Sequence, residues 1–193
     1  MADTFTSLEL YAREVEKDAK EGTDYLYHNE GNDHARIICT NIFKNANTEI
    51  RIAANQLYND EVVNTPEYIC SMKGFLDKPG TILKILIVDA PKVEDVKKDN
   101  TFYGMLFEHP AFKEGRITIK EGRGKSFSDD NGNKVNFCTA DDRMYRYETD
   151  ITRRKAVANF GDQKRSKELK DIFDRVYDKD GLTFSVDLNN FFM

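Results

Sequence analysis

Hydrophobic residues in the first fifty positions recur every three or four residues, the spacing of amphipathic α-helices. One apolar stripe lies within residues 8–19, after a cap at Thr6 or Ser7, and predicts an amino-terminal helix. A second stripe lies within residues 35–46 and predicts another helix, capped by Asn29 or Asn32. Each helix would bury one face against a common core.

The pattern then changes to short β-branched runs. Glu49–Ala54 alternates between apolar and polar residues and predicts a strand that enters the core. Ile82–Val88 is almost continuously apolar, which is typical of a strand buried on both faces of a parallel sheet. Between them, residues 60–76 predict a helix that Pro66 breaks or delays. Strand, helix and strand together form one crossover unit.

In the second half of the chain, charged residues 91–100 predict a short surface helix, and the aromatic segment 102–112 predicts a core-facing one. Four short strands with Asp/Asn-rich turns at 130–133 and 141–142 follow, namely 116–119, 135–139, 144–147 and 156–159. Asp162 then caps a final helix with an apolar face that includes Leu169 and Ile172.

This order of elements predicts an α/β fold, a mixed sheet flanked by helices with an amino-terminal helix added. The chain of 193 residues has no Pro/Gly/Ser-rich linker, so we expect a single domain. Within it we expect the amino-terminal helix over residues 1–22, the core over 23–177 and a carboxy-terminal tail over 178–193. Hydrophobic residues make up 39% and aromatic residues 11%, unlike the composition of disordered chains.

Charge is distributed unevenly along the chain. Residues 143–170 contain nine Lys/Arg and four Asp/Glu, a net charge of +5. Because the whole chain has a net charge of −5, the rest of the chain has a net charge of −10. The negative overall charge argues against a general nucleic-acid coat protein. It does not exclude a local basic patch on the surface. The basic segment is therefore the part of the chain in which we look for an anionic partner.

Cysteine usage and hydropathy indicate a cytoplasmic protein. Cys39, Cys70 and Cys138 are odd in number and lie in apolar surroundings, so we expect buried, reduced thiols. The amino terminus lacks the basic flank and apolar core of a secretion signal, and the longest apolar stretch, residues 82–90, is about half a membrane span. We therefore expect a soluble protein with no membrane partner.

Several familiar catalytic motifs are incomplete. Gly122–Ser126 ends in Gly-Lys-Ser, but Ile119 stands where a phosphate-binding loop needs its first glycine, so a mobile basic loop is the better interpretation. His28, His34 and His109 are not spaced as metal ligands, and no Gly-x-Ser-x-Gly elbow is present. We expect neither a metal site nor a cofactor.

One segment, from residue 133 to 174, does resemble a known pattern. Phospholipase D-like proteins carry a His-x-Lys-x-x-x-x-Asp strand followed by a Gly-Ser-x-Asn strand and a helix. Asp141 fits the aspartate and residues 156–159 fit the second strand, but Lys134 stands at the histidine position and Asn136 at the lysine position. The chain thus resembles a degenerate phospholipase D-like half without the nucleophile and the phosphate-binding lysine.

A set of polar residues on the predicted strands is the candidate site. If Tyr145 and Tyr147 point inward, Arg146 and Glu148 share the opposite strand face. In the functional interpretation Arg146 binds a phosphate or carboxylate through two hydrogen bonds and Asn159 donates to it. Arg143, Arg153 and Lys155 complete the ligand-binding set. The alternative interpretation is a solvated strand face with an ordinary ion pair.

Three functions fit these residues. The first is a non-catalytic protein that binds a phosphate-bearing partner, a nucleotide or nucleic acid, through residues 143–170. The second is a metal-dependent phosphodiesterase or nuclease with Asp141, Glu148 and Asn159 in a substituted catalytic site. The third is a homodimeric interaction module, because the resemblance implies that single phospholipase D-like halves pair to build one site.

Overall fold

The computed structural model describes residues 6–89, 101–122, 127, 134–178 and 184–185. In these segments eight strands form one mixed sheet in the order β1-β7-β6-β5-β2-β3-β4-β8. The strands are β1 Tyr27–Asn29, β2 Glu49–Ala54, β3 Ile82–Ile87, β4 Ile117–Glu121, β5 Asn136–Ala140, β6 Met144–Asp150, β7 Lys155–Asn159 and β8 Phe184–Ser185. The predicted α/β fold with a mixed sheet is confirmed.

The sheet has a parallel half and an antiparallel half. β2, β3 and β4 run parallel, and the α-helical connection between β2 and β3 is the crossover unit expected from the sequence. β5 pairs with β2 in the antiparallel sense, and β6, β7 and β1 continue antiparallel from it. The two halves therefore meet between β2 and β5, where the carboxyl end of one strand adjoins the amino end of the other.

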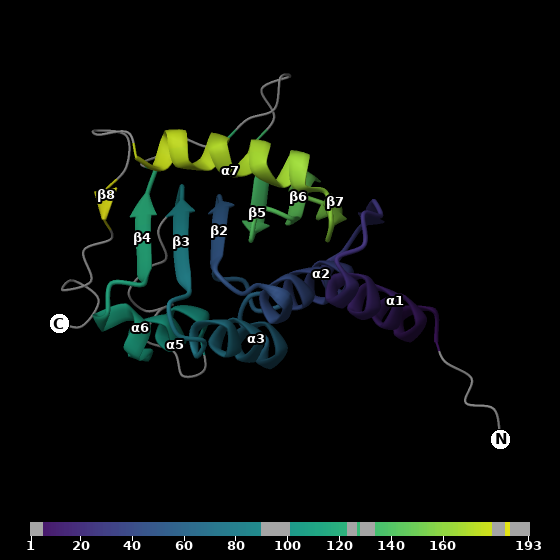
Figure 1. Ribbon diagram of the computed structural model, residues 1–193, viewed down its shortest axis with the longest axis horizontal. Coiled ribbons are helices and arrows are strands. Elements are labelled where there is room, and N and C mark those ends of the chain that lie inside the picture. Colours follow the sequence, from purple (N-terminus) through teal and green to yellow (C-terminus); the bar gives the residue numbers. More distant parts are fainter. Residues whose placement is uncertain (1–5, 90–100, 123–126, 128–133, 179–183, 186–193) are drawn as a thin grey trace.

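Helices cover both faces of the sheet (Figure 1). The main core lies between one face and five helices, α1 Ser7–Glu21, α2 Asn32–Asn45, α3 Pro66–Leu76, α5 Phe102–Glu108 and α6 Pro110–Lys113. On the other face α7, Gln163–Tyr177, crosses the strands and packs Leu169, Phe173 and Tyr177 against Ala53 and Phe137 in a smaller apolar cluster. Because side chains alternate along a strand, neighbouring residues in β5, β6 and β7 face different cores.

The amino-terminal helix forms as expected. Thr6 and Glu9 make a reciprocal capping box, and Gly22 ends the helix at φ +71°, a conformation that favours glycine. α2 differs from the expectation, because Gly31 occupies its cap position and Asn32 is already its first residue. Its helical stripe is nevertheless buried as the spacing predicts.

Proline sets two helix boundaries in the middle of the chain. α3 begins at Pro66, the later of the two starting points that the sequence allows, because proline fits the first turn of a helix but not its interior. The segment 102–112 forms two helices instead of one. Pro110 begins α6, and the His109 side chain caps it by accepting from the Ala111 amide at 3.1 Å.

Some expectations from the sequence are corrected or lie outside the described residues. Cys70 is exposed, unlike Cys39 and Cys138, and Ile172 on α7 is 41% exposed. The expected surface helix at 91–100, the turn at 130–133 and most of the loop at 122–126 are outside the described segments. β1 and the two residues of β8 were not expected as strands. Within the described part of the chain, every helix is too short or too polar to cross a bilayer.

Candidate functional site

A cavity of about 70 Å³ lies at the junction between the parallel and antiparallel halves of the sheet. Its walls are the carboxyl end of β2, the loop after that strand, the amino end of β5 and the middle of β6, with α2 and α3 above them. In α/β proteins ligands bind outside the carboxyl ends of parallel strands, where the strand order switches direction. The polar side chains that line it are Gln56, Asn59, Asn136, Arg146, Glu148 and Arg154, together with the two thiols Cys39 and Cys138.

Arg146 is the central charged residue of this cavity. It lies on β6 between Cys138 of β5 and Ala158 of β7, and it is only 7% exposed. One terminal nitrogen, Nη2, donates to Glu148 Oε1 at 3.1 Å and to the Arg154 carbonyl at 3.4 Å. The Nε–H has no hydrogen-bond partner among the described residues. A buried donor of this kind costs free energy unless a ligand or water accepts from it.

Glu148 balances the charge of Arg146 and is itself only 3% exposed. Its second oxygen, Oε2, accepts from the Asn136 amide nitrogen at 2.7 Å, and Asn136 Oδ1 accepts from the Asn55 backbone N–H at 2.8 Å. Burial opposes the charged form of Arg146, but the neighbouring Cys39 and Glu148 outweigh it and raise the pKa of the guanidinium. The pair is therefore a desolvated ion pair, which corrects the alternative of a solvated strand face.

The structure does not bring Arg146 and Asn159 into one pocket. Asn159 pairs in register with Tyr145, so it points to the α7 face of the sheet, and Arg146 points to the opposite face. The Asn159 side chain donates to Asp24 at 2.8 Å and accepts from the Gly161 and Asp162 amides, which fixes the turn before α7. The joint phosphate site expected from the sequence is corrected to a cavity around Arg146 alone.

The other expected ligand-binding residues also lie apart. Arg143 donates to the carbonyls of Phe160 and Asn45 at 2.8 and 3.1 Å, so it links the end of β7 to the end of α2. Arg153 is exposed on the β6–β7 turn, and Lys155 lies 3.5 Å from Glu30 at the surface. Among these three basic residues, none lines the Arg146 cavity.

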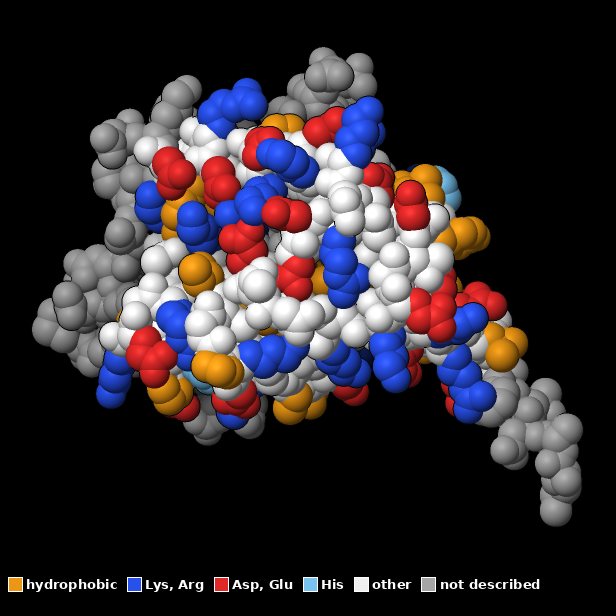
Figure 2. All heavy atoms as spheres, in the orientation of Figure 1, with side chains coloured by type: hydrophobic (Ala, Val, Ile, Leu, Met, Phe, Trp, Pro, Cys, Tyr) orange, Lys and Arg blue, Asp and Glu red, His pale blue; other side chains and the backbone are white. Residues whose placement is uncertain are grey.

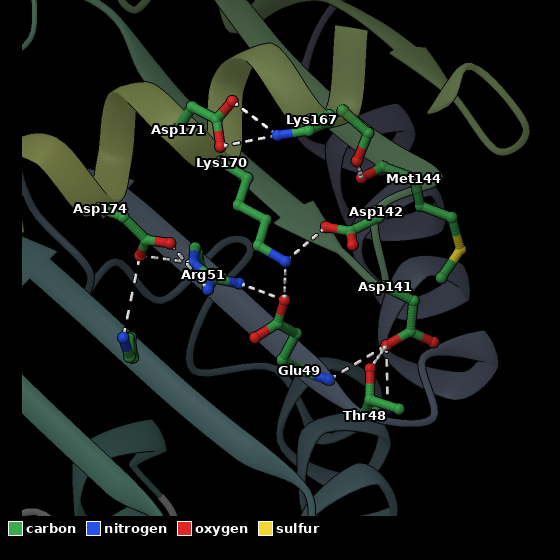
Figure 3. A network of polar contacts seen from close by, with 12 residues as sticks. Thr48, Glu49, Arg51, Asp141, Asp142, Met144, Lys167, Lys170, Asp171 and Asp174 are labelled. Atoms are coloured by element: carbon green, nitrogen blue, oxygen red, sulfur yellow. Dashed lines mark hydrogen bonds and ion pairs between the residues drawn. The ribbon is translucent and has the colours of Figure 1, made fainter. Parts of the chain in front are cut away.

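The acid pair expected for a metal-dependent enzyme is separated. Glu148 lies opposite Asn136 at one end of β5, and Asp141 follows the other end of that strand, about 16 Å away at about 3.3 Å per residue. Asp141 accepts from the backbone N–H groups of Thr48 and Glu49 at 2.8 and 3.0 Å and holds the entry to β2 (Figure 3). In the described segments, no three His, Cys, Asp or Glu side chains are grouped to hold a metal ion.

The basic segment 143–170 does not form an unbroken basic surface. Lys170 reaches Glu49 at 2.5 Å and Asp142 at 2.6 Å, and Lys167 pairs with Asp171 (Figure 3). Acidic residues that lie outside the segment thus neutralise much of its charge. The face shown in Figure 2 accordingly carries Lys/Arg and Asp/Glu side by side.

Sequence reasoning identified Arg146 and Glu148 as site residues but missed the other walls of the cavity, Asn136 among them. Cys39 comes from α2, far from β5 in the sequence, and Arg154 comes from the turn after β6, where strand periodicity no longer relates it to Arg146. The sequence did contain one indication that Cys138 belongs to this site. Cys138 lies two residues after Asn136 on the same strand, so both side chains share one strand face.

Comparison with known proteins finds similarity in structure. No protein-family model and no curated protein sequence matches the chain. One similar solved structure is TrmBL2, an archaeal chromatin protein that shows a novel mode of DNA binding, at 15% identity and a TM-score of 0.58 over 92% of this chain and 62% of TrmBL2. Another is phosphatidylserine synthase from Haemophilus influenzae Rd KW20, of phospholipase D-like fold, at 11% identity and a TM-score of 0.47 over 96% of this chain and 48% of the synthase. The chain spans less than two thirds of either protein, and its likeness to TrmBL2 shows a shared fold.

Proposed function

We propose that this protein is a non-catalytic binding protein on a phospholipase D-like scaffold and that it holds the phosphate group of a small ligand, such as a nucleotide, in the Arg146 cavity. The observation that carries the proposal is the buried guanidinium at the wall of the cavity, with an Nε–H that no described residue accepts from. Its ion pair with Glu148 occupies Nη2 only, so Nε is left for an incoming oxygen.

Charge and size support a phosphate as the ligand. The cavity is lined by two arginines, Arg146 and Arg154, and by one carboxylate, Glu148, so its fixed charge is positive. Hydrogen bonds between guanidinium and phosphate are charge-assisted and gain strength where water is excluded. A volume of about 70 Å³ exceeds by severalfold the roughly 10–15 Å³ that one water needs, which leaves room for a phosphate-sized group.

The residues at the phospholipase D-like positions support binding without catalysis. Lys134 occupies the position of the histidine nucleophile. Asn136, at the position of the phosphate-binding lysine, is already engaged with Glu148 and with the Asn55 amide. The side chain at the lysine position is therefore a neutral amide held in a hydrogen-bond network, and the histidine that serves the family as nucleophile is absent from this position of the chain.

A small ligand is favoured over a nucleic acid polymer. TrmBL2 binds DNA, so a nucleic acid partner belongs among the outcomes to be tested. A polyanion, however, needs an extended row of unpaired basic side chains, whereas Lys155, Lys167 and Lys170 already lie in ion pairs. We also propose that the protein acts in the cytoplasm. Whether two copies form a homodimer is tested by size-exclusion chromatography with light scattering.

The test is a thermal-shift titration with inorganic phosphate and a panel of nucleotides. A ligand at 100 times its Kd should stabilise the protein by about 2.7 kcal/mol, which raises Tm by roughly 5–11 °C for a chain of this size. Arg146→Lys keeps the charge but loses the planar fork, so it should abolish the shift. Arg153→Ala, which changes an exposed arginine away from the cavity, should leave the shift intact.

Two results would contradict the proposal. The first is the absence of any shift in the unmodified protein, and the second is a shift that Arg146→Lys leaves unchanged. Binding of single- or double-stranded DNA that weakens steeply with salt and ignores Arg146→Lys would instead support a nucleic acid surface elsewhere on the protein.

A further inference from the structure

Two of the three cysteines meet in the cavity although they are far apart in the sequence. Cys39 comes from α2 and Cys138 from β5, and both thiols line the cavity next to Arg146. They are 8% and 6% exposed, and each thiol shifts the pKa of the other. Cys70 lies exposed on α3, away from the residues that line this cavity.

The surroundings shift the pKa values of the two thiols in opposite directions. The hydrogen bond from Cys138 lowers the pKa of Cys39, burial opposes this change, and the positive charge of Arg146 adds to the lowering. The same hydrogen bond raises the pKa of Cys138, which therefore keeps its proton. Cys39 is thus the better nucleophile, and Cys138 is placed as the thiol that attacks second.

We propose that Cys39 and Cys138 are an oxidisable thiol pair that small hydroperoxides convert to a disulfide in the folded protein. In the first step the Cys39 sulfur attacks one peroxide oxygen, the O–O bond breaks, and water leaves from hydrogen peroxide as Cys39 becomes a sulfenic acid. In the second step the Cys138 sulfur attacks the Cys39 sulfur, and the hydroxyl leaves with the thiol proton as a second water. Two thiols and one peroxide give one disulfide and two waters.

The size of the cavity selects the oxidant. Hydrogen peroxide is little larger than water, so it fits a cavity of about 70 Å³ that reaches both sulfurs. An aromatic disulfide reagent is too large for that space and should react in the folded protein with the exposed Cys70 alone. The same cavity wall contains Arg146, so oxidation would also alter phosphate binding, a consequence that rests on the proposed function.

The experiment treats the folded full chain with hydrogen peroxide, blocks the remaining thiols after denaturation, and maps the peptides by mass spectrometry without reductant. The expected product is one crosslinked peptide pair that contains Cys39 and Cys138, lighter than the separate peptides by two hydrogens and restored by reductant. Cys70→Ser should give the same crosslink. Cys39→Ser and Cys138→Ser should each give none.

Three outcomes would overturn the proposal. One is a peroxide-treated protein in which both buried thiols remain free. Another is a crosslink that involves Cys70, and the last is oxidation of Cys39 to the sulfinic acid without a crosslink. Because the peptide map of the unmodified protein decides the matter, the result does not depend on whether a variant folds. A ligand titration of the oxidised protein then tests the effect on binding separately.

Discussion

Replacing Arg146 with alanine tests the buried ion pair at the centre of the cavity. Glu148, which is 3% exposed in the unmodified protein, would keep the Asn136 amide as its remaining side-chain donor. Removing one partner of a buried pair typically costs 3–5 kcal/mol, because the other charge stays desolvated. The hydrogen bond from Asn136 offsets part of this loss, so we expect about 3 kcal/mol. At about 2–4 °C per kcal/mol, this lowers Tm by roughly 6–12 °C.

A double-mutant cycle separates the pair from the packing of the arginine stem. Glu148→Gln removes the charge that Arg146→Ala strands, so the double variant should recover much of the lost stability. We expect a coupling free energy of about 1–3 kcal/mol, as for residues that share a polar contact. Equilibrium unfolding in urea, followed by circular dichroism, measures all four proteins. Arg153→Ala is the matched control and should change the free energy of unfolding by less than about 0.5 kcal/mol.

One result would refute this reasoning. If Arg146→Ala costs less than about 1 kcal/mol and shows no coupling with Glu148→Gln, the two charges are not desolvated together. The cavity described above would then be open to bulk water, and the free Nε–H would no longer indicate a ligand site.

Three further predictions concern the framework around the site. Asp141→Ala removes the acceptor for the backbone amides of Thr48 and Glu49 at the start of β2 and should lower the free energy of unfolding by about 1–3 kcal/mol in urea titrations. Asp141→Asn should lower it less, because asparagine tolerates the φ of 52° at this position. Burial raises the pKa of Glu49, but hydrogen bonds from Arg51 and Lys170 outweigh burial and lower the pKa in the folded protein. Glu49 should therefore stabilise the fold at pH values above its unfolded pKa, and this stabilisation should be lost as the pH falls through the lower, folded pKa. Thermal melts from pH 6 down to about 3 should show a shallower acid dependence for Glu49→Gln, and an unchanged slope would contradict that assignment. Thr6→Ala should cost about 1 kcal/mol of unfolding free energy through loss of the capping box, and hydrogen exchange in α1 should speed up.

The sequence predicted the fold where local signals agree with tertiary packing. The apolar run of β3 and the stripe of α7 are strong periodic patterns, and the Thr6 cap and the turn at 141–142 use residues suited to their backbone conformations. β1 was missed because three residues carry little periodic signal, and its partner β7 lies far along the chain. The split at Pro110 shows how one proline overrides a continuous aromatic pattern.

The site was predicted in part, because strand periodicity relates residues within one strand but does not say which face is buried. It placed Arg146 and Glu148 together, yet it grouped them with Asn159, whose face depends on the register between β6 and β7. The net charge of segment 143–170 also led to a wrong expectation, an extended basic surface, because it counts only residues that are close in sequence. Its lysines meet acids such as Glu49 that are remote in sequence, and only the folded chain brings these charges together.

The strand order has a consequence for how the nascent chain folds. β2 lies in the middle of the sheet, but its neighbours β3 and β5 are synthesised after it. β1 likewise cannot pair until its partner β7 has been synthesised. Until residue 159 has left the ribosome, strand edges that are paired in the finished protein remain exposed, and such edges favour aggregation. Pairing across so many residues also slows folding, because loop-closure entropy is lost before contacts form. A chaperone that shields β2 during synthesis would therefore act at the step where this protein is most vulnerable.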